Sequence, residues 1–207
     1  MPCSHILNCR MIKIYLVGVS DVGKSAIGKL LAGELEFVFY DLDGEIEKYF
    51  GKPISYIQEK FLSLSGYREE TCVVLKELLN KEENLVIASV PSGLRDFYLR
   101  QYKKSKENTE NTLISIHITD NPENLLERIT FYDKESLPLN KKLTKKEKRL
   151  YLSEIKKDIT FFNKFNNKAD YKFNVDGLKL ENIPKSLIEF LESKNQVFKR
   201  FMARAKE

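Results

Sequence analysis

The sequence predicts a three-layer α/β/α protein built around a central sheet of five parallel strands. Two observations lead to this fold class. Short apolar runs alternate with amphipathic stretches of helical periodicity along the 207 residues, and a glycine-rich loop joins the first run to the first amphipathic stretch. Strands that alternate with helices form parallel sheets covered on both faces, and strands buried on both faces read as continuous apolar runs.

Each predicted element follows from one of these runs. We expect strands at residues 12–19, 37–40, 85–90, 113–119 and 171–175. The periodicity of the remaining stretches predicts helices at residues 25–35, 45–50, 54–64, 71–79 and 124–131. From Pro184 onward the chain predicts one long helix, whose apolar stripe either packs on the domain or docks a partner.

We expect a single domain over most of the chain. Residues 1–11 read as a loose leader, and Met11 offers a second candidate start after Met1. The domain is expected to span residues 12–192, and residues 193–207 to form a C-terminal helical extension.

A lysine-rich stretch at residues 133–168 interrupts the alternation of strands and helices. It contains few apolar anchors, so it is either a solvated surface or a mobile lid over a phosphate site. We place this lid at about residues 133–160. The lysines at 103–106 predict an exposed linker.

Composition limits the classes of partner. The chain has 35 basic and 30 acidic residues, and its net charge of +5 suits anionic small molecules without pointing to nucleic acid. No apolar run approaches the ~20 residues of a membrane helix, and no secretory signal is visible. Three cysteines predict reduced thiols in the cytoplasm, although Cys3, His5 and Cys9 could be imagined as metal ligands. We expect a monomer that binds a small molecule.

The clearest motif is the phosphate loop, or P-loop, at residues 18–25, which reads Gly-Val-Ser-Asp-Val-Gly-Lys-Ser. It follows a predicted strand and opens a predicted helix, which is the context this motif requires. Lys24 should reach the β- and γ-phosphates of ATP, and the Ser25 hydroxyl should ligate Mg²⁺. The residues expected to contact the nucleotide are Gly18, Asp21, Val22, Gly23, Lys24, Ser25 and Ala26.

Asp21 is discordant within this loop, because a carboxylate there would face the phosphate charge. The side chain either points outward to solvent or points inward and weakens nucleotide binding.

Two carboxylates follow the second predicted strand. Asp41 and Asp43 share one side if the chain stays extended there, at the sheet edge where ligands bind. Asp41 could hold Mg²⁺ through water, and Asp43 could bind the acceptor and take a hydroxyl proton as a general base. The alternative is that Asp43 merely caps a helix starting near Glu45.

With these motifs in their order and spacing, the chain resembles the shikimate kinase family. The resemblance is specific over residues 12–79 and fainter up to about residue 192. The matching segments are the P-loop, Tyr40-Asp41-Leu42-Asp43, Gly51-Lys52-x-Ile54, Tyr67-Arg68, Leu125-Leu126-x-Arg128, Pro138-Leu139 and Ala169-Asp170.

The resemblance implies transfer of the γ-phosphoryl group of ATP to a hydroxyl of shikimate, with Mg²⁺, in aromatic amino acid biosynthesis. It implies that Asp43 and Arg68 hold the substrate, that Asp43 is the base and that Asp41 supports the metal. Arg128 would flank the adenine, together with residues near Asp176. A guanidinium fork beside a carboxylated substrate is also reasonable on physical grounds.

The chain departs from the family at four places on the acceptor side. Val90-Pro91-Ser92, followed by Gly93, stands in place of a triple glycine, and Leu137-Pro138 replaces the Arg-Pro of the lid. The second substrate-binding arginine falls at Phe161 or Phe162, and an acidic residue after Arg68 falls at Thr71.

Three functions therefore remain open. The first, which we adopt as the prediction, is a shikimate kinase-like phosphotransferase. The second is a kinase for another, less anionic hydroxylated acceptor. The third is a non-catalytic nucleotide-binding or regulatory protein whose C-terminal helix engages a partner.

Overall fold

The computed structural model describes residues 11–108 and 111–205. The predicted leader at residues 1–10, with Cys3, His5 and Cys9, lies outside them. In chain order the elements are β1 (Met11–Val17), α1 (Lys24–Leu35), β2 (Val38–Asp41), α2 (Leu42–Phe50), α3 (Ile54–Glu59), α4 (Leu64–Asn80), β3 (Leu85–Ala88), α5 (Asp96–Glu107), β4 (Asn111–Thr119), α6 (Pro122–Arg128), β5 (Phe131–Tyr132), β6 (Pro138–Leu139), α7 (Lys145–Asn166), β7 (Tyr171–Asn174), a 3₁₀ turn (Leu180–Asn182), α8 (Ile183–Lys194) and α9 (Gln196–Ala205).

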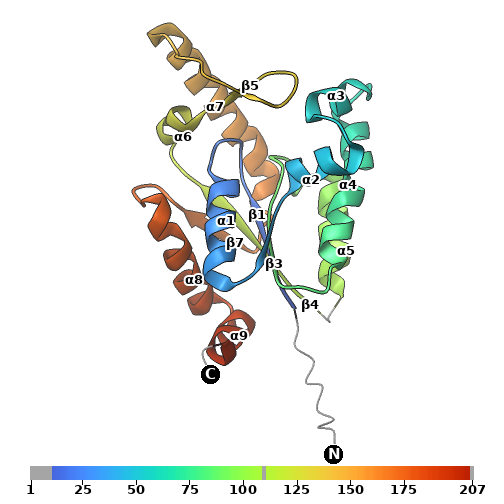
Figure 1. The fold of residues 1–207 in the computed structure, drawn as a ribbon. Coiled ribbons are helices and arrows are strands. Elements are labelled where there is room, and N and C mark those ends of the chain that lie inside the picture. Colours follow the sequence, from blue (N-terminus) through green and yellow to red (C-terminus); the bar gives the residue numbers. More distant parts are fainter. Residues whose placement is uncertain (1–10, 109–110, 206–207) are drawn as a thin grey trace, which may run out of the picture.

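The central sheet has five parallel strands in the order β2-β3-β1-β4-β7, which confirms the predicted fold class. Helices α1 and α8 cover one face, and α4 and α5 cover the other (Figure 1). Alternate residues of β1 feed the two cores: Ile14 and Leu16 face α1, whereas Tyr15 and Val17 face α4. This two-sided burial explains why β1 reads as an unbroken apolar run.

Helix α5 corrects the expectation of an exposed linker at residues 103–106. Its buried side is made by Tyr98 and Tyr102, which lie four residues apart. Lys103 and Lys104 are exposed, and Lys106 lies over the Tyr102 ring. A spacing of four residues places two side chains on one helix face. Because lysine dominates this segment, the sequence pattern conceals the short apolar stripe.

Helix α7 corrects the expectation that residues 133–168 have few apolar anchors. It begins with a capping box in which Thr144 and Glu147 satisfy each other's backbone N–H groups. Ile155, Ile159 and Phe162 then pack against the hydrophobic core. A helix of 22 residues therefore runs from the upper end of the molecule to the carboxyl end of the sheet (Figure 1).

The single helix expected from Pro184 is wrong, because Asn195 divides it into α8 and α9. The backbone of Asn195 is extended, with φ −124° and ψ 106°. Its Oδ1 accepts hydrogen bonds from the amides of Val197 and Phe198 at 3.1 and 3.0 Å. Asparagine is a favoured N-cap residue, so it ends one helix and starts the next. Phe198 is fully buried, which shows that α9 packs on the domain.

Among the residues that the structure describes, no helix combines the length and the apolar character needed to cross a membrane.

Candidate active site

The P-loop connects β1 to α1 at the carboxyl end of the sheet. Gly18 is required there because an added Cβ would come within 2.7 Å of the Ile118 carbonyl oxygen. Gly23 caps α1 with φ +96°, a conformation that only glycine adopts freely. The loop thus approaches β4 closely and presents the start of α1, whose N–H groups favour an anion.

Lys24 is the first residue of α1 and is buried. Its Nζ donates hydrogen bonds to the carbonyl oxygens of Gly18 and Val19 at 3.0 and 2.8 Å. Burial lowers the pKa of Lys24 to about 8, against the opposing charges of Asp43, Asp41 and Asp21. The ammonium is therefore still the main form at pH 7 and lies at the centre of the loop.

Asp21 adopts a left-handed backbone conformation with φ +59°, which aspartate tolerates better than most residues. Its Oδ1 accepts a long hydrogen bond, 3.4 Å, from the amide of Thr130. Burial raises the pKa of Asp21, while the Thr130 bond and the charges of Lys24 and Arg128 oppose this shift. The carboxylate therefore turns toward the segment after α6 and not to open solvent.

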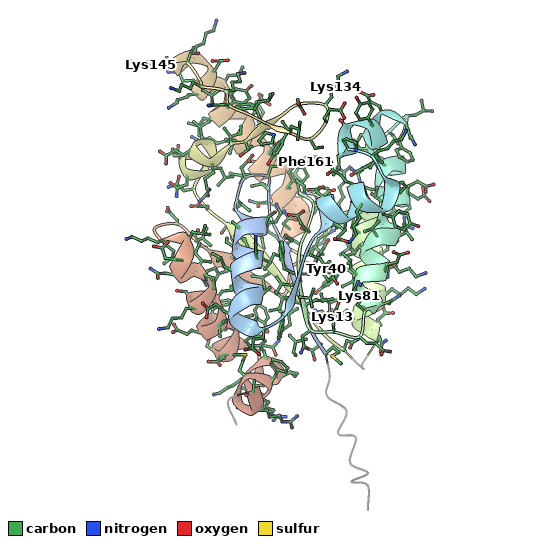
Figure 2. All side chains as sticks on the ribbon, in the orientation of Figure 1. Lys13, Tyr40, Lys81, Lys134, Lys145 and Phe161 are labelled. Carbon is green, nitrogen blue, oxygen red and sulfur yellow. The ribbon has the colours of Figure 1, made fainter. Side chains whose placement is uncertain are left out.

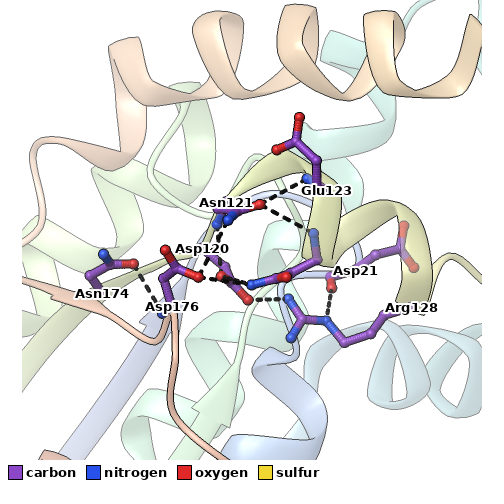
Figure 3. Close-up of polar contacts among 8 residues, drawn as sticks. Asp21, Asp120, Asn121, Glu123, Arg128, Asn174 and Asp176 are labelled. Atoms are coloured by element: carbon purple, nitrogen blue, oxygen red, sulfur yellow. Dashed lines mark hydrogen bonds and ion pairs between the residues drawn. The ribbon is translucent and has the colours of Figure 1, made fainter. Parts of the chain in front are cut away.

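Arg128, the last residue of α6, joins the P-loop to Asp120, which follows β4 (Figure 3). Its Nε donates to the Asp21 carbonyl oxygen at 3.2 Å, and its Nη2 pairs with the buried carboxylate of Asp120. Asn124 links Asp120 to Asp176, with distances of 2.8 and 3.0 Å from its Nδ2. The structure thus brings Arg128, Asp21 and Asp176 into one network of polar contacts.

A cavity of about 500 Å³ lies beside the carboxyl end of β2. It brings the predicted metal and acceptor residues together with side chains from α2, α3 and the segment between β5 and β6. The lining residues are Ser25, Asp41, Asp43, Glu47, Ile54, Ser55, Gln58, Tyr132, Asp133 and Ser136.

The chain does not stay extended after Asp41, because α2 begins at Leu42. Asp41 is the N-cap, and its Oδ1 accepts a hydrogen bond from the Asp43 amide at 3.1 Å. The capping role considered for Asp43 therefore belongs to Asp41. Since Asp43 is in the first turn of α2, its carboxylate remains available to the cavity.

Asp43 has a raised pKa of about 6. Burial is the main cause, the charges of Asp41 and Glu47 add to it, and Lys24 opposes it. A carboxylate with a pKa near 6 is ionised at pH 7 and is a better proton acceptor than an ordinary aspartate. The charge of Asp43 also acts on Lys24, which places the expected base and the P-loop lysine at one site.

The hairpin of β5 and β6, on which Figure 2 labels Lys134, lines the cavity with Tyr132, Asp133 and Ser136 and reaches α3. Ser55 donates to the Lys134 carbonyl oxygen at 2.6 Å, and Tyr56 donates to Glu135 at 2.6 Å. Ser136 donates to Glu47, also at 2.6 Å. These contacts tie the expected lid segment to the acceptor side.

Arg68 is not part of this cavity lining. It lies buried on α4, and its Nη2 pairs with the Asp96 carboxylate at 3.1 Å. Thr71, at the position where the family has an acidic residue, is also buried, and its hydroxyl lies 2.6 Å from that of Tyr98. Asp96 therefore supplies the acidic partner that Thr71 does not.

The loop after β3 packs tightly around Gly93. A Cβ on Gly93 would lie 2.5 Å from Ser89 Oγ and 2.7 Å from the Tyr15 hydroxyl, and this hydroxyl also donates to the Gly93 carbonyl oxygen. Val90 is buried in the core. In this structure Gly93 therefore serves packing and does not take the place of the family's triple glycine.

Sequence reasoning missed Asp120, Arg95 and Asp96. Asp120 follows the fourth strand, and the rule that ligands bind beyond the carboxyl ends of parallel strands could have found it. Arg95 and Asp96 meet Arg68 only because α4 and α5 pack together, so no local pattern identifies them.

These features agree with the comparisons to known proteins. A family model described as Shikimate kinase matches residues 21–192. The shikimate kinase of Coxiella burnetii (strain RSA 493) is 30% identical over 149 residues, which cover 72% of this chain and 79% of that protein. The shikimate kinase of Pelotomaculum thermopropionicum is 28% identical over 187 residues, or 90% and 99% of the two chains.

Solved structures give the same result. Shikimate kinase from Aquifex aeolicus superposes with a TM-score of 0.64 at 29% identity, covering 87% of this chain and 96% of the other. The enzyme from Bacteroides thetaiotaomicron gives a TM-score of 0.69 at 25% identity, with coverage of 88% and 99%. The chain therefore belongs to the shikimate kinase family of small-molecule kinases.

Proposed function

We propose that this chain transfers the γ-phosphoryl group of ATP to a hydroxyl group of shikimate in a reaction that requires Mg²⁺. The observation that best supports this proposal is the cavity shared by Ser25, Asp41 and Asp43, with Asp43 electrostatically coupled to Lys24. The residues proposed to bind phosphate, to ligate the metal ion and to accept a proton lie together there, as phosphoryl transfer requires.

ATP fits the P-loop on the observations above. The close approach at Gly18, the left-handed Gly23 and the exposed Ser25 and Ala26 leave backbone N–H groups accessible at the start of α1. In this proposal the nucleotide contacts the whole P-loop set, with Lys24 on the β- and γ-phosphates. Arg128, fixed to the P-loop backbone, flanks the adenine.

Mg²⁺ fits the same site. Among the described residues no group of three or more His, Cys, Asp or Glu side chains could hold a metal ion. A site with few protein ligands suits Mg²⁺, because proteins usually bind this ion through one or two side chains. Phosphate oxygens and water molecules complete its octahedral coordination. Ser25 would be a direct ligand, and Asp41 would act through water. The ion, when bound, neutralises charge on the transferring phosphoryl group.

Asp43 is the proposed general base. Its raised pKa suits removal of the proton from the acceptor hydroxyl as the bond to phosphorus forms. Lys24 stabilises the charge on the phosphoryl oxygens. Arg68 is proposed to bind the acceptor carboxylate beside its pair with Asp96. We further propose that the protein acts as a monomer in the cytoplasm, where ATP is supplied.

A coupled assay of ADP release tests this function. We expect release that depends on shikimate and Mg²⁺, and a loss of at least about 10³-fold in kcat for Lys24→Ala and Asp43→Asn. Lys29→Ala and Glu45→Gln are matched controls on the same helices and should retain activity.

Two outcomes would contradict the proposal. Release with a neutral polyol but not with shikimate would indicate a less anionic acceptor. Tight ATP binding without turnover of any hydroxylated acceptor would indicate a nucleotide-binding protein without catalysis.

A further inference from the structure

Two arginines and one aspartate form a charge cluster beside α4, which we name the Arg68–Asp96–Arg95 cluster. Arg68 Nη2 and Arg95 Nε lie 3.1 and 3.0 Å from the same atom, Asp96 Oδ2. One carboxylate oxygen thus holds two guanidinium groups at a fixed separation. Two positive charges against one negative charge leave the cluster positive, which favours a further anion.

The hydrogen-bonding capacity of this cluster is incompletely used. Within the described part of the chain, Arg68 Nε is buried without a hydrogen-bond partner, and Arg95 Nε contacts Asp96 as an ion pair without the geometry of a hydrogen bond. The Arg68 side chain is only 7% exposed. Buried donors without acceptors are costly, and a bound carboxylate would satisfy them.

Helix α7 fixes the orientation of Arg95. The guanidinium carbon of Arg95 lies 5.2 Å from the ring centre of Phe161 and 4.9 Å from that of Phe165. Phe161 is on the part of α7 that lies at the carboxyl end of the sheet (Figure 2). Stacking on two rings holds a guanidinium plane while its edge stays free for hydrogen bonds.

The packing of α2 on α4 places the cluster on the same side of the sheet as the proposed base, because Leu42, next to Asp43, shares a hydrophobic core with Tyr67, next to Arg68. The charge of Asp43 contributes to the raised pKa values of both Tyr67 and Tyr98. Tyr67 directly precedes Arg68, and Tyr98 follows Asp96 by two residues. Asp43 and the cluster therefore flank the same two buried tyrosines, so an acceptor next to Asp43 lies on the side of the molecule that carries both guanidinium groups.

Asp96 has the geometry of a positioning residue. It adopts φ +48° at the first residue of α5, a left-handed conformation that aspartate and asparagine tolerate better than other non-glycine residues. This backbone directs its carboxylate between Arg68 and Arg95.

We propose that Arg95 is a second carboxylate-binding side chain of the acceptor site and that Asp96 positions it beside Arg68. The inference rests on the proposed function, and it specifies the acceptor as a ring that carries one carboxylate. It also supplies a guanidinium group close to the position, Phe161 or Phe162, where the family's second substrate-binding arginine falls. The guanidinium expected at that position reaches it from the loop after β3 and stacks on the Phe161 ring.

Steady-state kinetics with shikimate and MgATP give the first test. Arg95→Gln should raise the KM for shikimate about tenfold or more and leave the KM for ATP unchanged, because it removes charge-assisted bonds to the carboxylate alone. Arg100→Gln is the matched control, since Arg100 also stacks on a ring, that of Phe97, but is exposed on α5.

Relocation of the guanidinium makes the kinetic test stricter. Phe161→Arg added to Arg95→Ala should recover much of the affinity for shikimate, which a purely structural role of Arg95 would not allow. Equal KM values for shikimate in the wild type and Arg95→Gln would overturn the inference and leave the proposed function intact.

Binding of cyclohex-1-ene-1-carboxylate tests the cluster without any turnover. This probe has the ring and the carboxylate but no hydroxyl group, so it can bind even if the chain does not phosphorylate shikimate. By calorimetry, Arg95→Gln and Arg68→Gln should each bind it about tenfold more weakly than the wild type. The uncharged carboxamide of the same ring should not distinguish the variants.

If Arg68→Gln fails to fold, Arg95→Gln decides the question, because Arg95 is only half-buried. Equal binding of the carboxylate by the wild type and Arg95→Gln would overturn the inference. Absence of shikimate turnover in the wild type would instead overturn the proposed function.

Discussion

Asp43 is the residue on which the chemistry depends most, and its pKa of about 6 makes a pH profile informative. A base must be unprotonated to act, so kcat/KM for shikimate should fall as the pH drops through about 6. Glu47→Gln should move this fall in kcat/KM to lower pH, because the Glu47 charge helps to raise the pKa of Asp43. A profile that stays flat down to pH 5 would contradict the assignment.

The same shift predicts a cost in stability. The folded pKa of Asp43 lies above its ordinary value of 3.8, so the folded state binds the proton more tightly than the unfolded state. The resulting loss in the free energy of unfolding is absent below pH 3.8, grows between pH 3.8 and about 6, and is complete above pH 6.

Asp43→Asn should therefore increase the free energy of unfolding at pH 7 by about 3 kcal/mol, and the gain should disappear near pH 3.5. Urea unfolding at the two pH values measures this difference. A variant that is less stable than the wild type at pH 7 would show that the carboxylate is held by favourable contacts.

Asp21 adds negative charge within the P-loop that we propose for the triphosphate. Asp21→Asn keeps a side chain that tolerates φ +59° and removes the charge, so the Kd for ATP should fall about threefold. Calorimetry with MgATP measures the change. Asp21→Ala is the control for the backbone and should destabilise the fold by about 1 kcal/mol. Weaker ATP binding in Asp21→Asn would mean that the carboxylate supports the loop.

At the residue scale, local sequence motifs were predictable from the sequence, and tertiary contacts between distant residues were not. The P-loop and the Asp41–Asp43 pair are short stretches whose chemistry follows from their neighbours in the chain. The partner of Arg68 was not predictable, because Asp96 lies 28 residues away on a helix that the sequence pattern conceals.

At the scale of elements, the break at Asn195 shows how one side chain divides a helix. Its Oδ1 accepts from two amides at the start of α9. Asn195→Ala should lower the free energy of unfolding by about 1 kcal/mol, whereas Asn195→Asp should retain the cap. Chemical denaturation of both variants provides the comparison, and equal loss in both would argue against a capping role.

The other elements show which patterns predict structure. Strands β1 and β4 were predicted because both of their faces are buried, which leaves a clear apolar run. Helices α5 and α7 were missed because lysines cover their exposed faces and only a narrow stripe packs inward. The capping box at Thr144 and Glu147 was a local signal that could have revealed α7.

Helix α9 belongs to the domain at the scale of the whole molecule. Phe198 is fully buried in the core beside α1 and α8, and the Phe201 ring meets that of Phe37 edge-on at 5.6 Å. Of the two alternatives left open by the sequence, this packing favours a C-terminal apolar stripe that covers the domain over one that docks a partner.

In the whole molecule, the sites proposed for ATP and for the acceptor lie at the same edge of the sheet. The P-loop and the Arg128 network lie on one side, and the cavity with Asp43 lies beside β2. The sequence predicted the parallel sheet and this edge. It did not predict the hairpin contacts from Ser55, Tyr56 and Ser136, which depend on how the β5–β6 segment folds back.

The most direct test of the central claim is phosphorus NMR of a mixture of the protein, shikimate, ATP and Mg²⁺. We expect a new phosphomonoester resonance that grows as the γ-phosphate signal falls and is absent with Asp43→Asn. Loss of the γ-phosphate signal with inorganic phosphate as the sole product, or no change at all, would contradict the claim that shikimate is the acceptor.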